Sequence, residues 1–185
     1  MEYLEIAIRC LLGVVFLASS LTKVAGRDAF DAFVGSVREL RLLPPGLGRP
    51  VARLVVVAEF GVWVLLALPT FWTYLVGLVV AEALLVAFAV GVGVSVRRGV
   101  RAPCRCFGAS ATPLGRRQVI RNVVLAVVPA VGVVAGLGAG PTRAGGVVAA
   151  LLGGLLSGGL VVVLDDILDL FQSVTPGPDP VRGPR

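Results

Sequence analysis

Residues 51–96 read "VARLVVVAEFGVWVLLALPTFWTYLVGLVVAEALLVAFAVGVGVSV" and contain two long apolar runs, Val51–Leu68 and Phe71–Val96. A helix needs about 20 mostly apolar residues to cross roughly 30 Å of hydrocarbon, and both runs are close to this length or longer. Little more than "PTFW" separates them. The stretch therefore predicts two membrane helices joined in a tight hairpin.

The whole chain has the composition of a membrane protein. Of its 185 residues, 57% are hydrophobic and 15% are charged, and the mean hydropathy is +0.95. This balance indicates a bilayer as the solvent. Three further runs are long enough to cross it: Leu4–Val24, Val119–Gly138 and Gly145–Leu164. We predict an all-α integral membrane protein with five transmembrane helices, whose first partner is the lipid bilayer.

Residues 27–43 are predicted to form an amphipathic helix at the membrane interface, ended by Pro44 and Pro45. Its apolar side chains recur three and four residues apart, at Phe30, Phe33, Val37 and Leu40. Glycines spaced by four residues predict close helix contacts in the last two spans, at Gly132, Gly136, Gly140, Gly154 and Gly158. Residues 173–185 are rich in Pro and Gly, and we expect them to be disordered.

Basic residues set the expected orientation. The first loop and its borders carry Lys23, Arg27, Arg38, Arg41, Arg49 and Arg53, and the third carries Arg97, Arg98, Arg101, Arg105, Arg116, Arg117 and Arg121. The other side has Arg9 and Arg143. The positive-inside rule predicts an outside N-terminus, with the loop at 97–118 and the C-terminus in the cytoplasm of a multi-pass cell-membrane protein. Topology and anionic lipid headgroups explain the net charge of +6, so no nucleic-acid partner is predicted.

The chain has no histidine. Haem ligation by histidine, histidine-zinc sites and Ser-His-Asp catalysis are therefore excluded within this chain. Thiols, carboxylates and arginine remain as the groups that could carry chemistry.

Two of the three cysteines lie one residue apart in the third loop, within "RAPCRCFG" at 101–108. Cys104 and Cys106 are flanked by Arg101 and Arg105, and cationic neighbours favour the nucleophilic thiolate. A disulfide between them would close a small, strained ring, which suits a donor or relay of oxidation better than a structural crosslink. The pair predicts thiol-disulfide redox chemistry.

The sequence also predicts a helix beginning just after this pair, with Thr112 as its N-cap and Pro113 in its first turn. Two alternatives to redox chemistry stay open. The thiolates could bind a soft ion such as Cu(I), or they could form half of a zinc site that another chain completes. We assign no residue as a metal ligand. The pair could also be an inert turn.

Cys10 lies roughly 20 Å from the cytoplasmic end of its span, so we interpret it as a packing residue.

Glu59 and Glu82 are lone acids inside the two spans of the hairpin. A carboxylate is costly within a membrane, so each should turn inward and find a cation or stay protonated. The two positions lie at similar depth and are candidates to face each other, sharing a proton or serving a quinone or proton path. The structural alternative is pairing with one of four residues: Arg9, Lys23, Arg121 or Asn122.

The chain resembles the MauE family of methylamine-utilisation membrane proteins, which is related to the DoxX-like four-helix proteins. The likeness rests on "RCLLGVVFLASSLTKVAGRDAF" at 9–30, "ELRLLP" at 39–44, Glu59, "RRGVRAPCRCFG" at 97–108 and "RNVVL" at 121–125. By position, the family motif is matched by Cys104, Cys106, Phe107, Gly108, Arg121 and Asn122. Arg105 departs from it, because family members often have glycine between the cysteines.

The resemblance implies a four-helix membrane domain over residues 1–138, followed here by a fifth membrane helix over 139–172. It also implies work beside a thioredoxin-like protein in maturing a disulfide-containing client for methylamine metabolism. The chain would then be a candidate thiol-disulfide oxidoreductase. The one candidate cofactor is the quinone that the intramembrane acids Glu59 and Glu82 suggest. The competing interpretation is a non-enzymatic membrane scaffold or metal-thiolate carrier. The oligomeric state is not readable from the sequence.

Overall fold

The computed structural model describes residues 2–44, 46–99, 103–104, 112–113, 116–136 and 144–173. Over these residues the helices are α1 (Glu2–Val24), α2 (Arg27–Glu39), α3 (Gly48–Ala67), α4 (Phe71–Arg97), α5 (Arg116–Gly136) and α6 (Ala144–Ser173). Two short strands, β1 (Pro103–Cys104) and β2 (Thr112–Pro113), pair in antiparallel fashion between α4 and α5.

Five of the helices, α1 and α3 to α6, are long and apolar enough to cross a membrane. In hydrocarbon every backbone amide and carbonyl must find a partner within the protein, and a helix satisfies this requirement within one segment. The predicted all-α integral membrane protein is therefore confirmed. The tight turn of the predicted hairpin ends at Thr70, whose hydroxyl caps α4 by accepting a hydrogen bond from the Thr73 amide at 3.4 Å.

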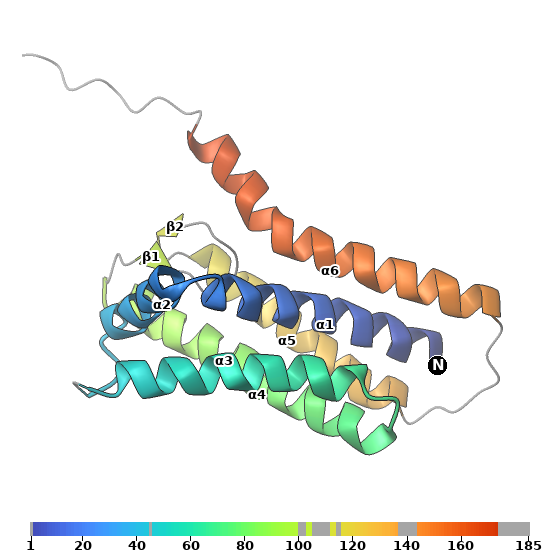
Figure 1. Cartoon of the computed structure of the whole chain (residues 1–185). Coiled ribbons are helices and arrows are strands. Elements are labelled where there is room, and N and C mark those ends of the chain that lie inside the picture. Colours follow the sequence, from blue (N-terminus) through green and yellow to red (C-terminus); the bar gives the residue numbers. More distant parts are fainter. Residues whose placement is uncertain are drawn as a thin grey trace, which may run out of the picture.

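Helices α1, α3, α4 and α5 form a four-helix bundle (Figure 1). α1 packs against α3 and α5, and α4 packs against the same two helices, so the bundle closes around one apolar core. Leu12, Phe16, Leu78 and Leu85 are fully buried there. α6 packs along α1, and α2 lies at one end of the bundle against α1 and α3.

α2 ends at Glu39, earlier than the predicted end at residue 43. The reason is local, because Arg41 adopts a left-handed backbone conformation with φ 51°, which a continuing α-helix cannot contain. The end of α2 is also held by α4, since the Ser95 hydroxyl donates to the Leu40 carbonyl at 3.2 Å. Phe33 anchors the buried face of α2 against α3.

The glycines predicted to mediate close contacts in α6 lie against α1. A Cβ atom at Gly154 would collide with the Ala7 carbonyl oxygen and approach Cys10, and one at Gly158 would lie 2.9 Å from the Leu11 carbonyl oxygen. Only glycine lets the two backbones come this close. Without aqueous solvent to drive apolar surfaces together, this close contact supplies the attraction between α1 and α6.

We expect Gly154→Leu to separate α6 from α1, because overpacking a tight contact costs about 1–3 kcal/mol. Faster maleimide labelling of Cys10, in a Cys104→Ser, Cys106→Ser background in detergent, would report the separation. Gly153→Leu is the matched control, since nothing lies within 4 Å of a Cβ at that position. Equal labelling of Cys10 in the two variants would contradict the contact described above.

Candidate functional site

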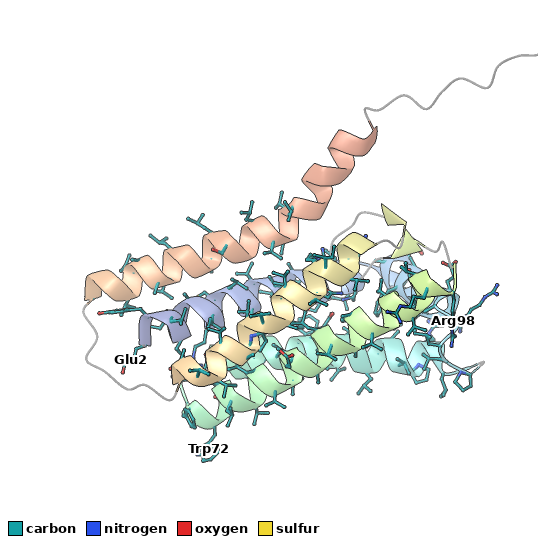
Figure 2. All side chains as sticks on the ribbon, turned by 180° about the vertical axis from the view of Figure 1, so that it is seen from behind. Glu2, Trp72 and Arg98 are labelled. Carbon is teal, nitrogen blue, oxygen red and sulfur yellow. The ribbon has the colours of Figure 1, made fainter. Side chains whose placement is uncertain are left out.

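The segment that carries Cys104 lies at the end of the bundle where α2 is found (Figure 1). β1 pairs Cys104 with Thr112 of β2, and β1 also contacts α2. Figure 2 shows Arg98 at this end and Glu2 and Trp72 at the other. We call the end with α2, β1, β2 and Arg98 the basic end.

The predicted helix start at Thr112 and Pro113 is wrong. These two residues form β2, and α5 begins at Arg116. A residue before proline is pushed toward extended backbone, which suits a strand as well as an N-cap, so the sequence signal was ambiguous. The other predicted site residues of this loop lie outside the described residues: Arg101, Arg105, Cys106, Phe107 and Gly108.

A buried ion pair joins α1 to α3 toward the basic end. The Lys23 ammonium donates to Oε1 of Glu59 at 2.5 Å and to the Ser19 hydroxyl at 2.7 Å, and that hydroxyl donates to the same Glu59 oxygen at 3.1 Å. The side chains of Lys23 and Glu59 are 2% and 0% exposed. Of the partners predicted for Glu59, the structure therefore selects Lys23.

Two aromatic rings complete the surroundings of the Lys23 ammonium. Nζ lies 5.0 Å from the ring centroid of Phe33 on α2 and 5.7 Å from that of Phe88 on α4. Both distances fall within the range of cation–π attraction. The charge thus contacts side chains from four helices, α1 to α4. We refer to Ser19, Lys23, Phe33, Glu59 and Phe88 as the lysine cage.

The direction of the Lys23 side chain is informative. A lysine near the end of a membrane helix normally extends toward the headgroups and keeps its charge in water. Lys23 instead reaches back by one turn to Ser19 and into the bundle. It is also the only lysine of the chain, since all other basic residues are arginine. The occurrence of a single lysine is the sequence signal that could have marked Lys23 as a site residue.

The remaining intramembrane candidates are Glu82 on α4 and Arg121 and Asn122 on α5. Glu82 is partly buried and Asn122 is fully buried, and their side chains have polar atoms without a hydrogen-bond partner among the described residues. Among the described residues no hydrogen bond joins the Glu82 carboxyl group to that of Glu59, so the two acids are not paired there. Arg121 is partly buried beside Asn122 in sequence and makes further interactions.

Arg9 has a structural role at the opposite end. Its guanidinium bonds Oε1 of Glu5 at 2.8 Å, donates to the carbonyls of Leu66 and Leu68 at 3.0 and 2.7 Å, and lies 4.3 Å from the Tyr74 ring centroid. The free carbonyls at the end of α3 carry partial negative charge, which a cation stabilises. Arg9 is thus not the partner of Glu59.

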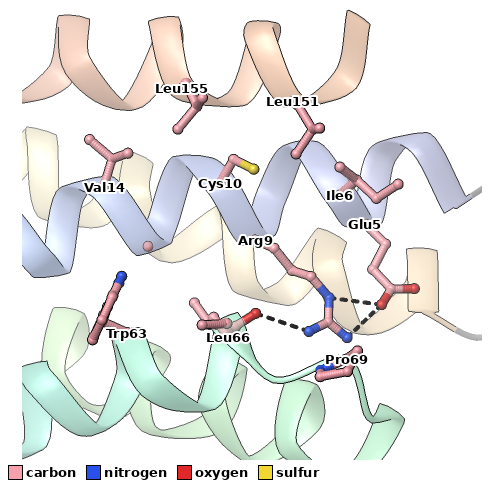
Figure 3. A pocket seen from close by; sticks show the side chains of 12 residues that line it. Glu5, Ile6, Arg9, Cys10, Val14, Trp63, Leu66, Pro69, Leu151 and Leu155 are labelled. Carbon is pink, nitrogen blue, oxygen red and sulfur yellow. Dashed lines mark hydrogen bonds and ion pairs between the residues drawn. The ribbon is translucent and has the colours of Figure 1, made fainter. Parts of the chain in front are cut away.

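A groove of about 530 Å³ lies between α1, α3 and α6 (Figure 3). Cys10 and Trp63 line it, with the Arg9 and Glu5 pair at one side. The donors of Arg9 point at Glu5 and Leu66 rather than into open space. Cys10 is partly buried on the side of α1 that faces Gly154 of α6, and it lies far along α1 from the basic end.

Comparison with known proteins gives one family. The family described as "Methylamine utilisation protein MauE" matches residues 1–136, which hold α1 to α5 and leave α6 outside. A curated relative, the "Methylamine utilization protein MauE" of Paracoccus denitrificans, is 34% identical over 121 residues. That match covers 64% of this chain and 62% of the relative, so less than two thirds of the relative's length is represented. No solved structure matches the chain.

Proposed function

Because this chain belongs to the MauE family of methylamine utilisation proteins, we propose that it is a membrane thiol-disulfide redox protein serving methylamine metabolism. Cys104 and Cys106 form its reactive pair. A thioredoxin-like protein is its partner, and a disulfide-containing protein is the client whose maturation it supports.

The observation that carries this proposal is the position of Cys104. Its segment is the polar connection between two membrane helices, and it pairs with β2 while contacting α2. α2 is itself held by the lysine cage through Phe33 and by Ser95 through Leu40. A reactive cysteine needs a fixed mounting, and the pairing of β1 with β2 together with its contact to α2 supplies one.

The proposed exchange conserves atoms and electrons. One cysteine thiolate of the dithiol pair attacks a disulfide of the thioredoxin-like partner, forming a mixed disulfide, and the departing partner sulfur takes up a proton. The second cysteine loses its proton and attacks the mixed disulfide, which releases the second partner thiol. In total, two electrons and two protons pass from the pair to the partner, and the reverse sequence oxidises the partner.

Glu59 and Glu82 are the proposed proton-handling residues of the bundle, with a quinone as the candidate electron carrier. Support comes from the cost of a carboxylate in a membrane, which makes such residues functional candidates by default. Glu59 has an oxygen, Oε2, that is buried without a partner among the described residues, so its pairing with Lys23 leaves one oxygen free to bind a proton.

Labelling with a membrane-impermeant maleimide in intact cells tests the sidedness of this proposal. We expect Cys104 and Cys106 to be labelled only after lysis, because the charge distribution predicts that their loop faces the cytoplasm. A cytoplasmic thioredoxin-type protein would then be the partner. Labelling in intact cells that requires prior reduction would mean an outward disulfide, overturn the predicted topology and favour oxidative maturation outside the cytoplasm. Cys10, read by peptide mass in the same sample, is the internal control.

A further inference from the structure

Asn122 is a fully buried amide whose Oδ1 and Nδ2 both lack a hydrogen-bond partner among the described residues. An asparagine side chain offers two donors and one acceptor with two lone pairs. Lipid chains can satisfy none of these, and buried polar groups in proteins nearly always find a protein or water partner. The geometry therefore calls for a polar partner beside Asn122.

Asn122 lies at the depth of the lysine cage. A Cβ at Gly132 of α5 would lie 3.2 Å from Ile8 of α1 and 3.0 Å from Leu78 of α4, so these three positions are level. α5 runs antiparallel to both helices (Figure 1). Moving back along α5 from Gly132 to Asn122 therefore moves forward by the same number of residues, to the level of Ala18, the neighbour of Ser19, on α1 and of Phe88 on α4.

Glu59 supplies a second unsatisfied group in that layer. Its Oε1 accepts from Lys23 and Ser19, whereas its buried Oε2 has no partner among the described residues. One buried water typically makes about three hydrogen bonds to such groups. Water between Asn122 and Oε2 would satisfy both side chains at once.

The start of α5 provides a polar route to this layer. Gln118 lies one turn before Asn122 on the same face of α5, is buried and makes its own interactions. Asn122 is six residues from the first residue of α5, Arg116, which corresponds to about 9 Å along the helix. The layer is thus close enough to the basic end for water to enter past Gln118.

We propose that Asn122 and Oε2 of Glu59 bind a shared water cluster, fed from the basic end, which makes the Lys23–Glu59 pair a proton-exchange site. A proton arriving through the water adds to Oε2, and it leaves by the same route. In general a lysine ammonium is able to release a proton, which the guanidinium of an arginine cannot do in proteins. The use of the one lysine of the chain at this position fits such a role. The inference deepens the proton-handling part of the proposed function and rests on it.

Selective isotope labelling tests the proposal without ambiguity, because Asn122 is the only asparagine and Lys23 the only lysine in the sequence. In proteoliposomes, water-edited solid-state NMR measures how fast magnetisation passes from water to the Asn122 amide and the Lys23 ammonium. We expect fast transfer to both groups, and several-fold slower transfer to Lys23 in an Asn122→Leu variant. Val123→Leu is the matched control, since Val123 is 52% exposed on the outer side of α5 and should leave the transfer unchanged.

Transfer to Asn122 as slow as that to the buried ring of Tyr74 would show a dry interior and overturn the proposal. An Asn122→Leu variant that folds but leaves the transfer to Lys23 unchanged would overturn it too. The same spectra recorded on a Cys104→Ser, Cys106→Ser variant separate this inference from the thiol function. In that variant, water should still reach Lys23, although all thiol-disulfide exchange by the cysteine pair is lost.

Discussion

Replacing Lys23 by methionine is expected to lower the free energy of unfolding by about 3–5 kcal/mol, the cost of leaving a buried charge without its partner. Glu59 is 0% exposed and would lose its only cationic contact among the described residues. It would have to stay charged in a medium of low polarity or take up a proton, and either outcome forfeits the attraction that the ion pair supplied. Denaturant unfolding in mixed micelles measures the loss.

Two further variants show whether charge is the cause. In Lys23→Met, Glu59→Leu both charges are removed, and most of the stability should return, because apolar replacement of a whole buried pair is often neutral. Arg49→Met is the surface control, since the Arg49–Asp31 pair at 3.0 Å is 53% and 56% exposed, and such pairs contribute about 0–1 kcal/mol. If Lys23→Met costs no more than Arg49→Met, the lysine cage does not hold a stabilising ion pair.

Replacing one cysteine of the pair by serine is expected to abolish thiol turnover and to trap the thioredoxin-like partner. The remaining thiol can still attack a partner disulfide, but no second thiol is present to resolve the mixed disulfide. Gel electrophoresis with and without reductant, followed by mass spectrometry, identifies the adduct. The double serine variant should form none, and Cys10→Ser should behave as the unaltered protein because Cys10 lines the groove beside α6, far from the basic end.

The same variants decide between the two functions that the cysteines allow. Stoichiometric Cu(I) or zinc that survives purification and is lost in Cys104→Ser would favour a metal-thiolate carrier. A double serine variant that supports methylamine metabolism as well as the unaltered protein would contradict both functions, and would leave a membrane scaffold.

The five spans were predictable because hydrocarbon permits few solutions for a long apolar run. The glycine spacing in α6 also predicted a close contact, but it did not say which helix would be the partner. Gly154 meets Ala7 of α1, a choice set by the shapes of both helices. The spans and the α3–α4 hairpin could therefore be predicted from the sequence, and the partner of α6 could not.

Lys23 shows why the site was only partly predictable. It lies at the end of an apolar run, where a basic residue normally marks the membrane border, and it therefore counted toward the orientation of the chain. The structure buries it against Glu59. One lysine among many arginines is a composition signal, but its meaning depends on the ring of Phe33 in α2 and on the carboxylate in α3, which only the fold brings together.

A redox titration of the Cys104–Cys106 pair in the purified membrane protein tests the central proposal most directly. The loss of two hydrogens from the peptide that carries both cysteines is followed by mass across defined thiol-disulfide buffers. We expect a single two-electron transition at a potential above about −300 mV, the upper range of structural disulfides, because a redox-active pair must give up its oxidation readily. A pair that stays as two free thiols in every buffer would contradict the redox function.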